Sequence, residues 1–68
     1  MTTQQLSDRE RQCLQWIAKG KTSWETAAIL QVSERTVNFH VGNACRKLNV
    51  YKRQAGVSLA IQQGLLDS

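Results

Sequence analysis

Apolar residues recur at the spacing of an amphipathic α-helix in four segments of this chain, each flanked by residues that begin or end helices. Ser7 and Glu10 form the sequence of a capping box before the first segment, and Gly20 follows it. Gly64 follows the last segment in the same way. The pattern predicts an all-α domain whose four helices cover about residues 8–19, 23–30, 34–48 and 53–63.

The step between the second and third predicted helices has the spacing of a helix-turn-helix motif. Ala27 is small enough for close helix packing. Leu30 and Val32 are apolar on either side of the corner, and Val37 anchors the next helix. Ser33 is a good N-cap for that helix, because its hydroxyl accepts a backbone N–H from the first turn. The same spacing fits an αα-hairpin with no DNA partner, so spacing alone leaves both interpretations open.

With 68 residues the chain makes one small domain, which buries only about 60% of its unfolded surface. We expect residues 6–66 to form this domain and residues 1–5 to be a disordered tail. The chain has one histidine and no nucleophile beside a base, so we expect neither a cofactor nor an enzyme. No segment approaches the roughly 20 apolar residues of a membrane span, so we expect a cytoplasmic, nucleoid-associated protein.

Two cysteines, Cys13 and Cys45, stand far apart in the sequence, with no cysteine or histidine at metal-ligand spacing. We therefore expect no bound metal. The number of cysteines alone leaves a single disulfide open, but we favour two buried thiols in a reduced cytosol.

The net charge of +4 comes from one part of the chain. Residues 33–53 contain one acidic residue, Glu34, and five basic ones, Arg35, Arg46, Lys47, Lys52 and Arg53. The excess lies on the third predicted helix and the loop after it, which is typical of a surface for a polyanion. No amphipathic basic helix with a bulky apolar face is present, so a membrane surface is a poor partner. We expect double-stranded DNA.

The predicted helix over residues 34–48 has two contrasting faces. Its apolar stripe must pack against the first two helices and consists of Val37, Val41, Ala44 and Leu48. The opposite face combines guanidinium groups, an amide, a glycine and an aromatic ring, which suit base edges in the major groove. The base contacts that we predict from this face are Arg35, Asn38, Phe39, Gly42 and Arg46.

Two rings on this helix allow a second interpretation. Phe39 suits contact with a thymine methyl group, but a ring half-buried under the second helix fits the sequence nearly as well. His40 falls between the two faces, where we favour a packed, hydrogen-bonded ring over a base contact.

Hydroxyls, an ammonium group and free backbone N–H groups converge at the start of the second predicted helix. Thr22 or Ser23 caps this helix, and the same groups suit a DNA phosphate. Polar side chains at the start and along the side of the third helix are further candidates. The phosphate contacts that we predict are Lys21, Thr22, Ser23, Ser33, Thr36, Asn43 and Lys47.

Over residues 6–66 the chain resembles the LuxR-type (GerE-like) helix-turn-helix family. The matching runs are Leu6-Ser7-Asp8-Arg9-Glu10, Gly20-Lys21-Thr22-Ser23-Trp24-Glu25, Ser33-Glu34-Arg35-Thr36-Val37-Asn38-Phe39-His40-Val41, Lys47-Leu48 and Gly64-Leu65-Leu66. Residues 21–25 and 37–40 are most similar to the quorum-sensing branch, whose members carry an N-terminal acyl-homoserine-lactone domain. The resemblance implies a four-helix domain in which the second and third helices form the motif.

The resemblance also implies a bacterial transcription regulator that binds an inverted repeat as a dimer through the fourth predicted helix. The expected interface consists of Val57, Ala60 and Ile61, a patch too small for a stable dimer, so we expect a monomer that pairs on DNA. Nothing in this chain suits a lactone, so a signal would enter through another domain. RNA polymerase is left open as a further partner. The alternative function is a protein-interaction module that heterodimerises with or inhibits a related regulator.

Three departures from the family pattern bear on packing and readout. Thr26 stands where the family usually has an aliphatic residue, and its hydroxyl suits a bond to the carbonyl of Thr22. Gly56 stands where alanine is favoured and costs about 1 kcal/mol of helix propensity. Gly42 and Ala44 are smaller than in many members, so the base preference of a relative cannot be transferred.

Overall fold

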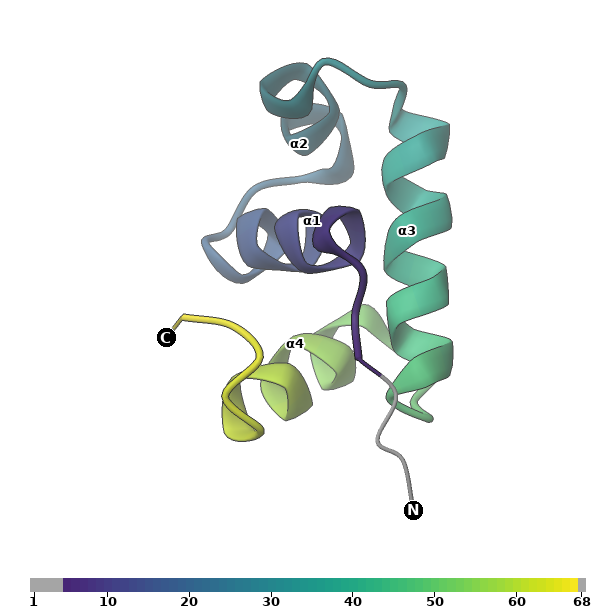
Figure 1. The fold of residues 1–68 in the computed structure, drawn as a ribbon. Helices are drawn as coiled ribbons and strands as arrows, with labels where there is room; N and C mark the ends of the chain where they lie inside the picture. Colours follow the sequence, from purple (N-terminus) through teal and green to yellow (C-terminus); the bar gives the residue numbers. More distant parts are fainter. Residues whose placement is uncertain (1–4, 68) are drawn as a thin grey trace.

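Four helices account for most of residues 5–67, the part of the chain that the computed structural model describes (Figure 1). Helix α1 spans Asp8–Ala18, α2 spans Ser23–Leu30, α3 spans Glu34–Lys47 and α4 spans Arg53–Gln62. No strand occurs among the described residues, and the prediction of an all-α domain is confirmed. Three helices end one residue earlier than predicted, because the last predicted residue is the C-cap: Lys19, Leu48 and Gln63. Residues 1–4 of the predicted tail lie outside the described residues.

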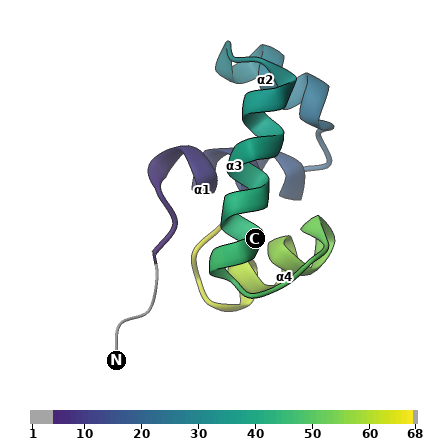
Figure 2. The ribbon, with the colours of Figure 1, turned by 90° about the vertical axis from the view of Figure 1, so that its right-hand side faces the viewer.

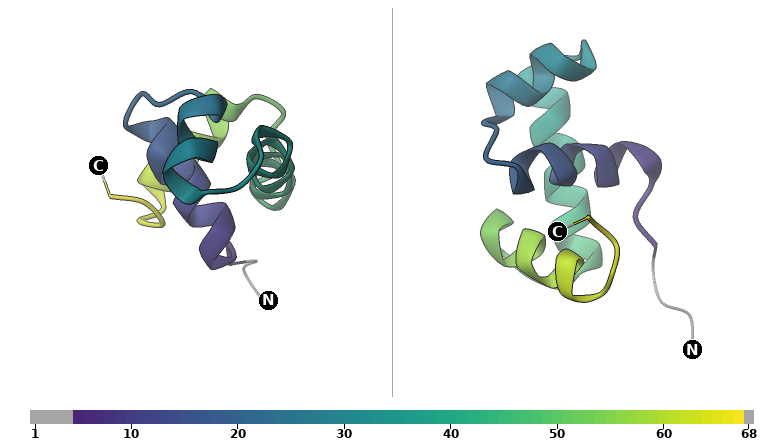
Figure 3. Two further views of the ribbon diagram at one scale, coloured as in Figure 1. Left: turned by 90° about the horizontal axis from the view of Figure 1, so that it is seen from above. Right: turned by 90° about the vertical axis from the view of Figure 1, so that its left-hand side faces the viewer.

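Helix α3 lies along one side of the molecule, and the other three helices pack against it (Figures 1 and 2). Helix α1 crosses the middle of α3, while α2 lies at its N-terminal end and α4 at its C-terminal end. Two further views place these three helices in one layer beside α3 (Figure 3). None of the described helices covers the opposite face of α3.

The core forms where the apolar stripe of α3 meets α1. Val37 and Ala44 are fully buried and Val41 is nearly so, which confirms the predicted inner face of α3. Cys13 and Leu14 of α1 are fully buried in the same cluster. The cluster also includes residues of α2 and α4, so three helices pack on the apolar stripe of α3. The face of α3 opposite the stripe therefore stays outside the core.

Polar residues before the first two helices cap them. Ser7 and Glu10 complete a capping box, with N–H···O distances of 3.2 and 2.9 Å. Thr22, rather than Ser23, caps α2, and Glu25 completes a second box with distances of 3.0 and 2.9 Å. The backbone hydrogen bond from Thr22 lowers the pKa of Glu25. Local bonds thus fix both helix starts; the capping box at Ser7 is confirmed, and the second box with Glu25 was not predicted.

A sharp corner joins α2 to α3 and gives the helix-turn-helix motif its shape. Gln31 adopts the left-handed conformation, with φ of 59°, and so ends α2. The N–H of Val32 returns to the carbonyl of Ala27 at 3.0 Å. Ser33 then caps α3 by accepting the N–H of Thr36 at 3.0 Å. The corner predicted from spacing is confirmed.

Two of the departures seen in the sequence have a direct structural explanation. Thr26 is fully buried, and its hydroxyl donates to the carbonyl of Thr22 at 2.8 Å, as expected. Gly56 leaves room for the thiol of Cys45, since a Cβ at position 56 would stand 2.9 Å from Sγ. Cys13 and Cys45 are free and buried, and burial raises the pKa of each thiol. The interpretation as two buried thiols is therefore confirmed.

A buried carboxylate joins the start of α1 to the end of α3. Glu10 is 5% exposed and its Oε1 accepts a hydrogen bond from Nζ of Lys47 at 2.8 Å. Burial raises the pKa of Glu10, but hydrogen bonds from Lys47 and Ser7 and the charge of Lys47 together outweigh it, so the pKa lies below its ordinary value. The pair therefore stabilises the folded state while Glu10 is ionised.

The segment after α4 folds back onto α1. Gln15 and Asp67 exchange two hydrogen bonds between side chain and backbone, of 2.9 and 3.1 Å. Leu66 is buried with the core cluster. These contacts of the segment after α4 fix the position of α4 relative to α1.

We predict that Gly56→Ala destabilises the domain although alanine favours helices. The new methyl group would stand 2.9 Å from Sγ of Cys45, which is buried and has little room to move. Overpacking of this kind costs about 1–3 kcal/mol, more than the roughly 1 kcal/mol gained in helix propensity. Urea unfolding followed by circular dichroism measures the change.

Two variants make that experiment specific. Gly42→Ala places its methyl group in open space on α3, so it should raise the free energy of unfolding by about 0.5–1 kcal/mol. Cys45→Ala removes the obstructing sulfur, so Gly56→Ala should cost less in that background. Equal stabilisation by alanine at positions 42 and 56 would contradict the predicted clash.

We predict that Glu10→Gln lowers the free energy of unfolding by about 1.5–3 kcal/mol at pH 7, the range for a hydrogen bond to a charged group. Because the pKa of Glu10 is lowered on folding, its contribution is complete above the pKa of an unfolded glutamate. The contribution is lost as the pH falls through the lowered pKa of the folded state. Urea unfolding of parent and variant, measured over a pH series, should show the two converging in acid.

The matched control for this pH series is Asp8→Asn, which removes an exposed carboxylate from the same helix. It removes the same charge without breaking a bond between α1 and α3, so it should lower the free energy of unfolding at pH 7 much less than Glu10→Gln. A difference between parent and Glu10→Gln that stays constant from neutral pH into acid would refute the role of the ionised carboxylate.

Candidate nucleic-acid interface

The residues predicted to meet bases share one face of α3 by their helical spacing. Figure 2 shows that no described helix covers α3 on the side away from α1, α2 and α4, which we call its outer face. All five positions are exposed: Arg35, Asn38, Phe39, Gly42 and Arg46. At Gly42 a Cβ would have no atom within 4 Å, so the backbone of α3 is openly accessible there. The structure thus joins the five into one surface, and their contacts with bases stay a prediction.

Phe39 is 62% exposed, so the interpretation as a ring half-buried under the second helix is wrong. Its ring packs edge-on against His40, with centroids 5.6 Å apart and planes at 63°. His40 is partly buried beside it, which agrees with a packed ring. The exposed ring of Phe39 gives the outer face an apolar contact suited to a base or its methyl group.

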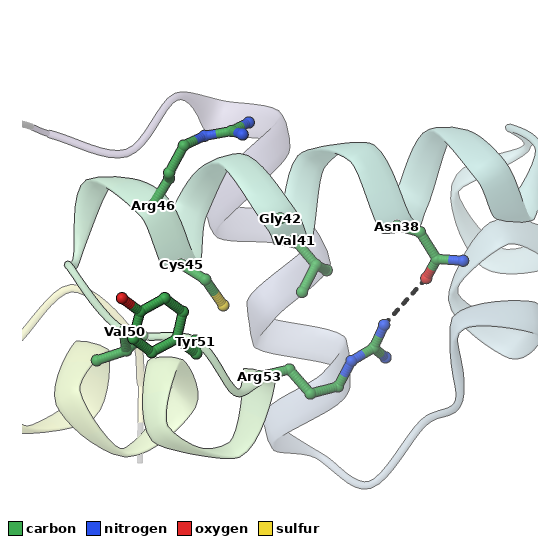
Figure 4. Close-up of a pocket in the computed structure, with 8 residues that line it drawn as sticks. All are labelled: Asn38, Val41, Gly42, Cys45, Arg46, Val50, Tyr51 and Arg53. Carbon is green, nitrogen blue, oxygen red and sulfur yellow. Dashed lines mark hydrogen bonds between the residues drawn. The ribbon is translucent and has the colours of Figure 1, made fainter.

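Asn38 is held by side chains from two other helices (Figure 4). The hydroxyl of Ser23, on α2, donates to Oδ1 of Asn38 at 2.7 Å. Arg53, on α4, donates to the same oxygen from Nη2 at 2.9 Å and to Oγ of Ser23 from Nη1 at 2.8 Å. Arg53 was not among the predicted site residues, because the sequence indicates only its basic charge. Partners 15 and 30 residues apart leave no local pattern to detect.

The residues predicted to contact phosphates fall at the two ends of α3 and at the start of α2. Lys21, Thr22 and Ser33 are exposed at helix starts, and Thr36 is partly exposed. Ser23 is 8% exposed and its hydroxyl is turned inward, so only its backbone N–H suits a phosphate. The structure therefore gives these residues unequal access to a ligand.

Asn43 and Lys47, the other two predicted phosphate contacts, already bind partners within the domain. Lys47 is paired with Glu10, and its side chain is 31% exposed. Asn43 accepts a hydrogen bond from the guanidinium group of Arg46. Both lie on the side of α3 toward the start of α1, where intramolecular bonds hold their polar groups in place.

Two hollows flank Arg46. One, of about 350 Å³, lies between α3 and the loop before α4, and its lining includes Asn38, Tyr51 and Arg53 (Figure 4). The other, of about 410 Å³, is lined by Glu10, Asn43, Arg46 and Lys47.

Within residues 5–67 no cluster of side chains offers three ligands to a metal ion. Nor does any described helix have the length and apolar character to span a membrane.

The residues predicted at a dimer interface do not form an exposed patch. Val57 and Ala60 are 8% and 0% exposed and belong to the core, so the prediction for these two residues is corrected. They are buried because α4 turns them toward α1 and α3. Ile61 is partly exposed. The exposed residues on the outer side of α4 are Gln54, Ala55, Ser58 and Gln62.

Comparison with known families matches this arrangement to one class of protein. Residues 4–60 match the GerE profile, described as bacterial regulatory proteins of the luxR family. The transcriptional activators LuxR of Aliivibrio fischeri and VanR of Vibrio anguillarum are each 48% identical to the chain over 62 residues. RpaR of Rhodopseudomonas palustris, a quorum sensing-dependent transcriptional regulator, is 49% identical over 61 residues. These alignments cover 90–91% of this chain but 25–26% of each relative, so the chain spans about a quarter of their length.

Solved structures show the same fold. The transcription factor GerE matches with a TM-score of 0.86 at 29% identity, covering 91% of this chain and 92% of that one. Escherichia coli SdiA matches with a TM-score of 0.87 at 42% identity, covering all of this chain and 29% of that one. The family consists of transcription regulators, which confirms that the chain is not an enzyme. The chain belongs to the LuxR family of bacterial regulatory proteins, and its four helices form the helix-turn-helix DNA-binding domain of that family.

Proposed function

We propose that this domain recognises a specific sequence in double-stranded DNA by placing the outer face of α3 in the major groove. The observation that carries the proposal is the composition of that face, which no described helix covers and which exposes Arg35, Asn38, Phe39 and Arg46. An α-helix fits the major groove, where arginine suits guanine and an aromatic ring suits the thymine methyl group. The face thus offers both polar and apolar contacts to base edges.

The helix starts support this orientation of the domain. Lys21 and Thr22 at the start of α2, and Ser33 and Thr36 at the start of α3, place hydroxyls and an ammonium group where the helix dipoles are positive. Both helix starts are therefore suited to bind the DNA phosphates beside the groove. These contacts would fix the register of α3 without reading the sequence.

The other end of α3 supplies further phosphate candidates. Lys47 gives one of its three N–H donors to Glu10 and a second, at 3.4 Å, to the backbone oxygen of Gln5, and it keeps the third for a phosphate. Asn43 lies beside it with its oxygen engaged by Arg46 and its amide hydrogens available for donation. Phosphate contacts at both ends would hold α3 along the groove.

We further propose that two copies of the domain bind an inverted repeat and pair through α4. With Val57 and Ala60 in the core, the pairing surface is the outer side of α4, where Ile61 lies beside small and polar residues. A surface of this size and polarity suits a monomer in solution that pairs on DNA, because the second half-site raises the effective concentration.

The activity of the whole protein is a wider proposal. The chain spans about a quarter of its relatives, which are transcriptional activators and regulators. We propose that it serves a bacterial transcription regulator that acts at the nucleoid in the cytoplasm. A signal would then be received by a separate domain, and RNA polymerase is a candidate partner on the promoter.

The test of sequence recognition is a selection from a random duplex library at moderate salt. The parent should enrich an inverted repeat, and the double variant Arg35→Ala, Asn38→Ala should lose or relax that preference, by about 1–3 kcal/mol per base contact. The control Arg11→Ala, Gln63→Ala removes the same two kinds of group from exposed positions on α1 and after α4. It should keep the preference of the parent.

Equal, sequence-blind binding by the parent and the double variant would refute base recognition. That result would favour the alternative function, a module that binds or inhibits a related regulator. Circular dichroism shows whether each variant is folded, so a loss of base preference can be distinguished from unfolding.

We predict that Gly42→Ala affects folding and DNA binding in opposite directions. The methyl group relieves the low helix propensity of glycine, but it would hold the backbone of α3 away from the groove floor. Specific affinity should fall by about 1 kcal/mol or more, the scale of one base contact. Unfolding experiments and fluorescence anisotropy with the selected duplex measure the two effects.

The slope of affinity against salt distinguishes this effect from loss of a phosphate contact. Gly42→Ala should leave the slope unchanged, whereas Lys21→Gln should reduce it by about one and weaken all sequences alike. Unchanged affinity of Gly42→Ala for the selected duplex would argue against close approach at Gly42.

A further inference from the structure

We propose that Arg53 is a positioning residue that fixes Asn38 as a hydrogen-bond donor and thereby decides which bases Asn38 accepts. The inference rests on the proposed insertion of α3 into the major groove. It concerns a residue on α4 that lies outside the predicted base-reading set. Its physical basis is a ring of three hydrogen bonds that joins α2, α3 and α4.

The orientation of the Asn38 carboxamide follows from the chemistry of its partners. A guanidinium group donates hydrogen bonds and accepts none, so the group that faces Arg53 must be the oxygen. Nη2 of Arg53 lies 2.9 Å from Oδ1, and the hydroxyl of Ser23 donates to the same atom at 2.7 Å. Two donors thus occupy both lone pairs of this oxygen.

Ser23 closes the ring of bonds. Its Oγ accepts from Nη1 of Arg53 at 2.8 Å while its own hydrogen goes to Asn38. Ser23 is 8% exposed, so water competes little for these bonds. Rotation of the Asn38 carboxamide would break two hydrogen bonds and bring its amide hydrogens against those of Arg53.

The amide nitrogen of Asn38 therefore remains free to meet DNA. Figure 4 shows this nitrogen on the side of the carboxamide that points away from Arg53. Asn38 is exposed, so both amide hydrogens are accessible. In this state the side chain donates to a base edge and accepts nothing from it.

Because the Asn38 side chain can then donate hydrogen bonds to a base but not accept them, its expected base preference changes. The paired contact of asparagine with adenine uses its oxygen to accept from N6 and its nitrogen to donate to N7. With Oδ1 of Asn38 occupied, that contact is lost. Guanine presents two neighbouring acceptors, O6 and N7, and thymine presents O4. We therefore expect the keto bases guanine and thymine to outcompete adenine at the position that Asn38 reads.

The place of Arg53 in α4 agrees with a role outside that helix. Arg53 is its first residue, where a cation opposes the helix dipole, and Lys52 caps the helix without a side-chain hydrogen bond. The guanidinium group instead reaches back to α3 and α2. Arginine is suited to this task because its rigid fork donates to two acceptors at once.

The test repeats the duplex selection with the parent, Asn38→Ala, Arg53→Lys and Ser23→Ala. The position at which Asn38→Ala relaxes the preference identifies the base read by Asn38. Arg53→Lys keeps the positive charge but loses the rigid fork that donates to Ser23 and Asn38 at once, so the carboxamide of Asn38 is held less firmly and can turn its oxygen toward DNA. We expect adenine to gain about tenfold relative to guanine at that position, the discrimination of one paired contact, with other positions unchanged. Ser23→Ala should shift the same position in the same direction by a smaller factor.

Arg46→Lys is the matched control, because it makes the same exchange on the outer face of α3 itself. It should alter a different position of the site. Thermal unfolding of every variant shows whether it is folded, and Ser23→Ala provides an independent variant if Arg53→Lys unfolds.

Three outcomes would overturn the inference, and they differ from one another. An unchanged base preference in Arg53→Lys, together with an Arg53→Gln variant that weakens all sequences alike and lowers the salt slope, would make Arg53 a phosphate contact. A parent that selects adenine at the Asn38 position would show that Oδ1 is released on DNA. A parent that selects no sequence would instead defeat the proposed function, and the inference with it.

Discussion

Burial of one stripe of α3 is the constraint on which the rest of the structure depends. Val37, Val41 and Ala44 must be covered, and α1 crosses them while α2 and α4 close the two ends. Residues 5–67 form no further helix on the other side of α3. Within this part of the chain, the packing that buries the stripe therefore leaves the outer face of α3 exposed.

Burial of the apolar stripe sets the rotation of α3 about its axis only coarsely, because apolar packing is non-directional. Polar bonds supply the direction at both ends of the helix. Lys47 is tied to Glu10 at the C-terminal end, and Asn38 is tied to Ser23 and Arg53 nearer the N-terminal end. The same bonds that orient the helix also hold Asn38, so this residue serves the packing of the domain and the base contact that we propose for it.

The sequence predicted well those features that depend on neighbouring residues. Helix positions, the caps at Ser7 and Ser33 and the inner face of α3 follow from local spacing and capping chemistry, and the structure has them. The inner face of α4 was mispredicted, because apolar residues surround most of this helix and its pattern does not indicate which side is buried. Val57 and Ala60 are therefore in the core although they were expected on the surface.

Polar pairs between residues far apart in the chain could not be predicted from the sequence. These pairs change how the positive charge of the chain is interpreted. Lys47 and Arg53 both contribute to the positive excess of residues 33–53, yet each is engaged within the domain, with Glu10 in one case and with Ser23 and Asn38 in the other. A basic residue that holds a neighbour in place is not equivalent to one that is free to neutralise a phosphate. The net charge therefore indicates the class of partner, while the hydrogen bonds indicate which cations hold α3 in place and which are left for the DNA contacts that we propose.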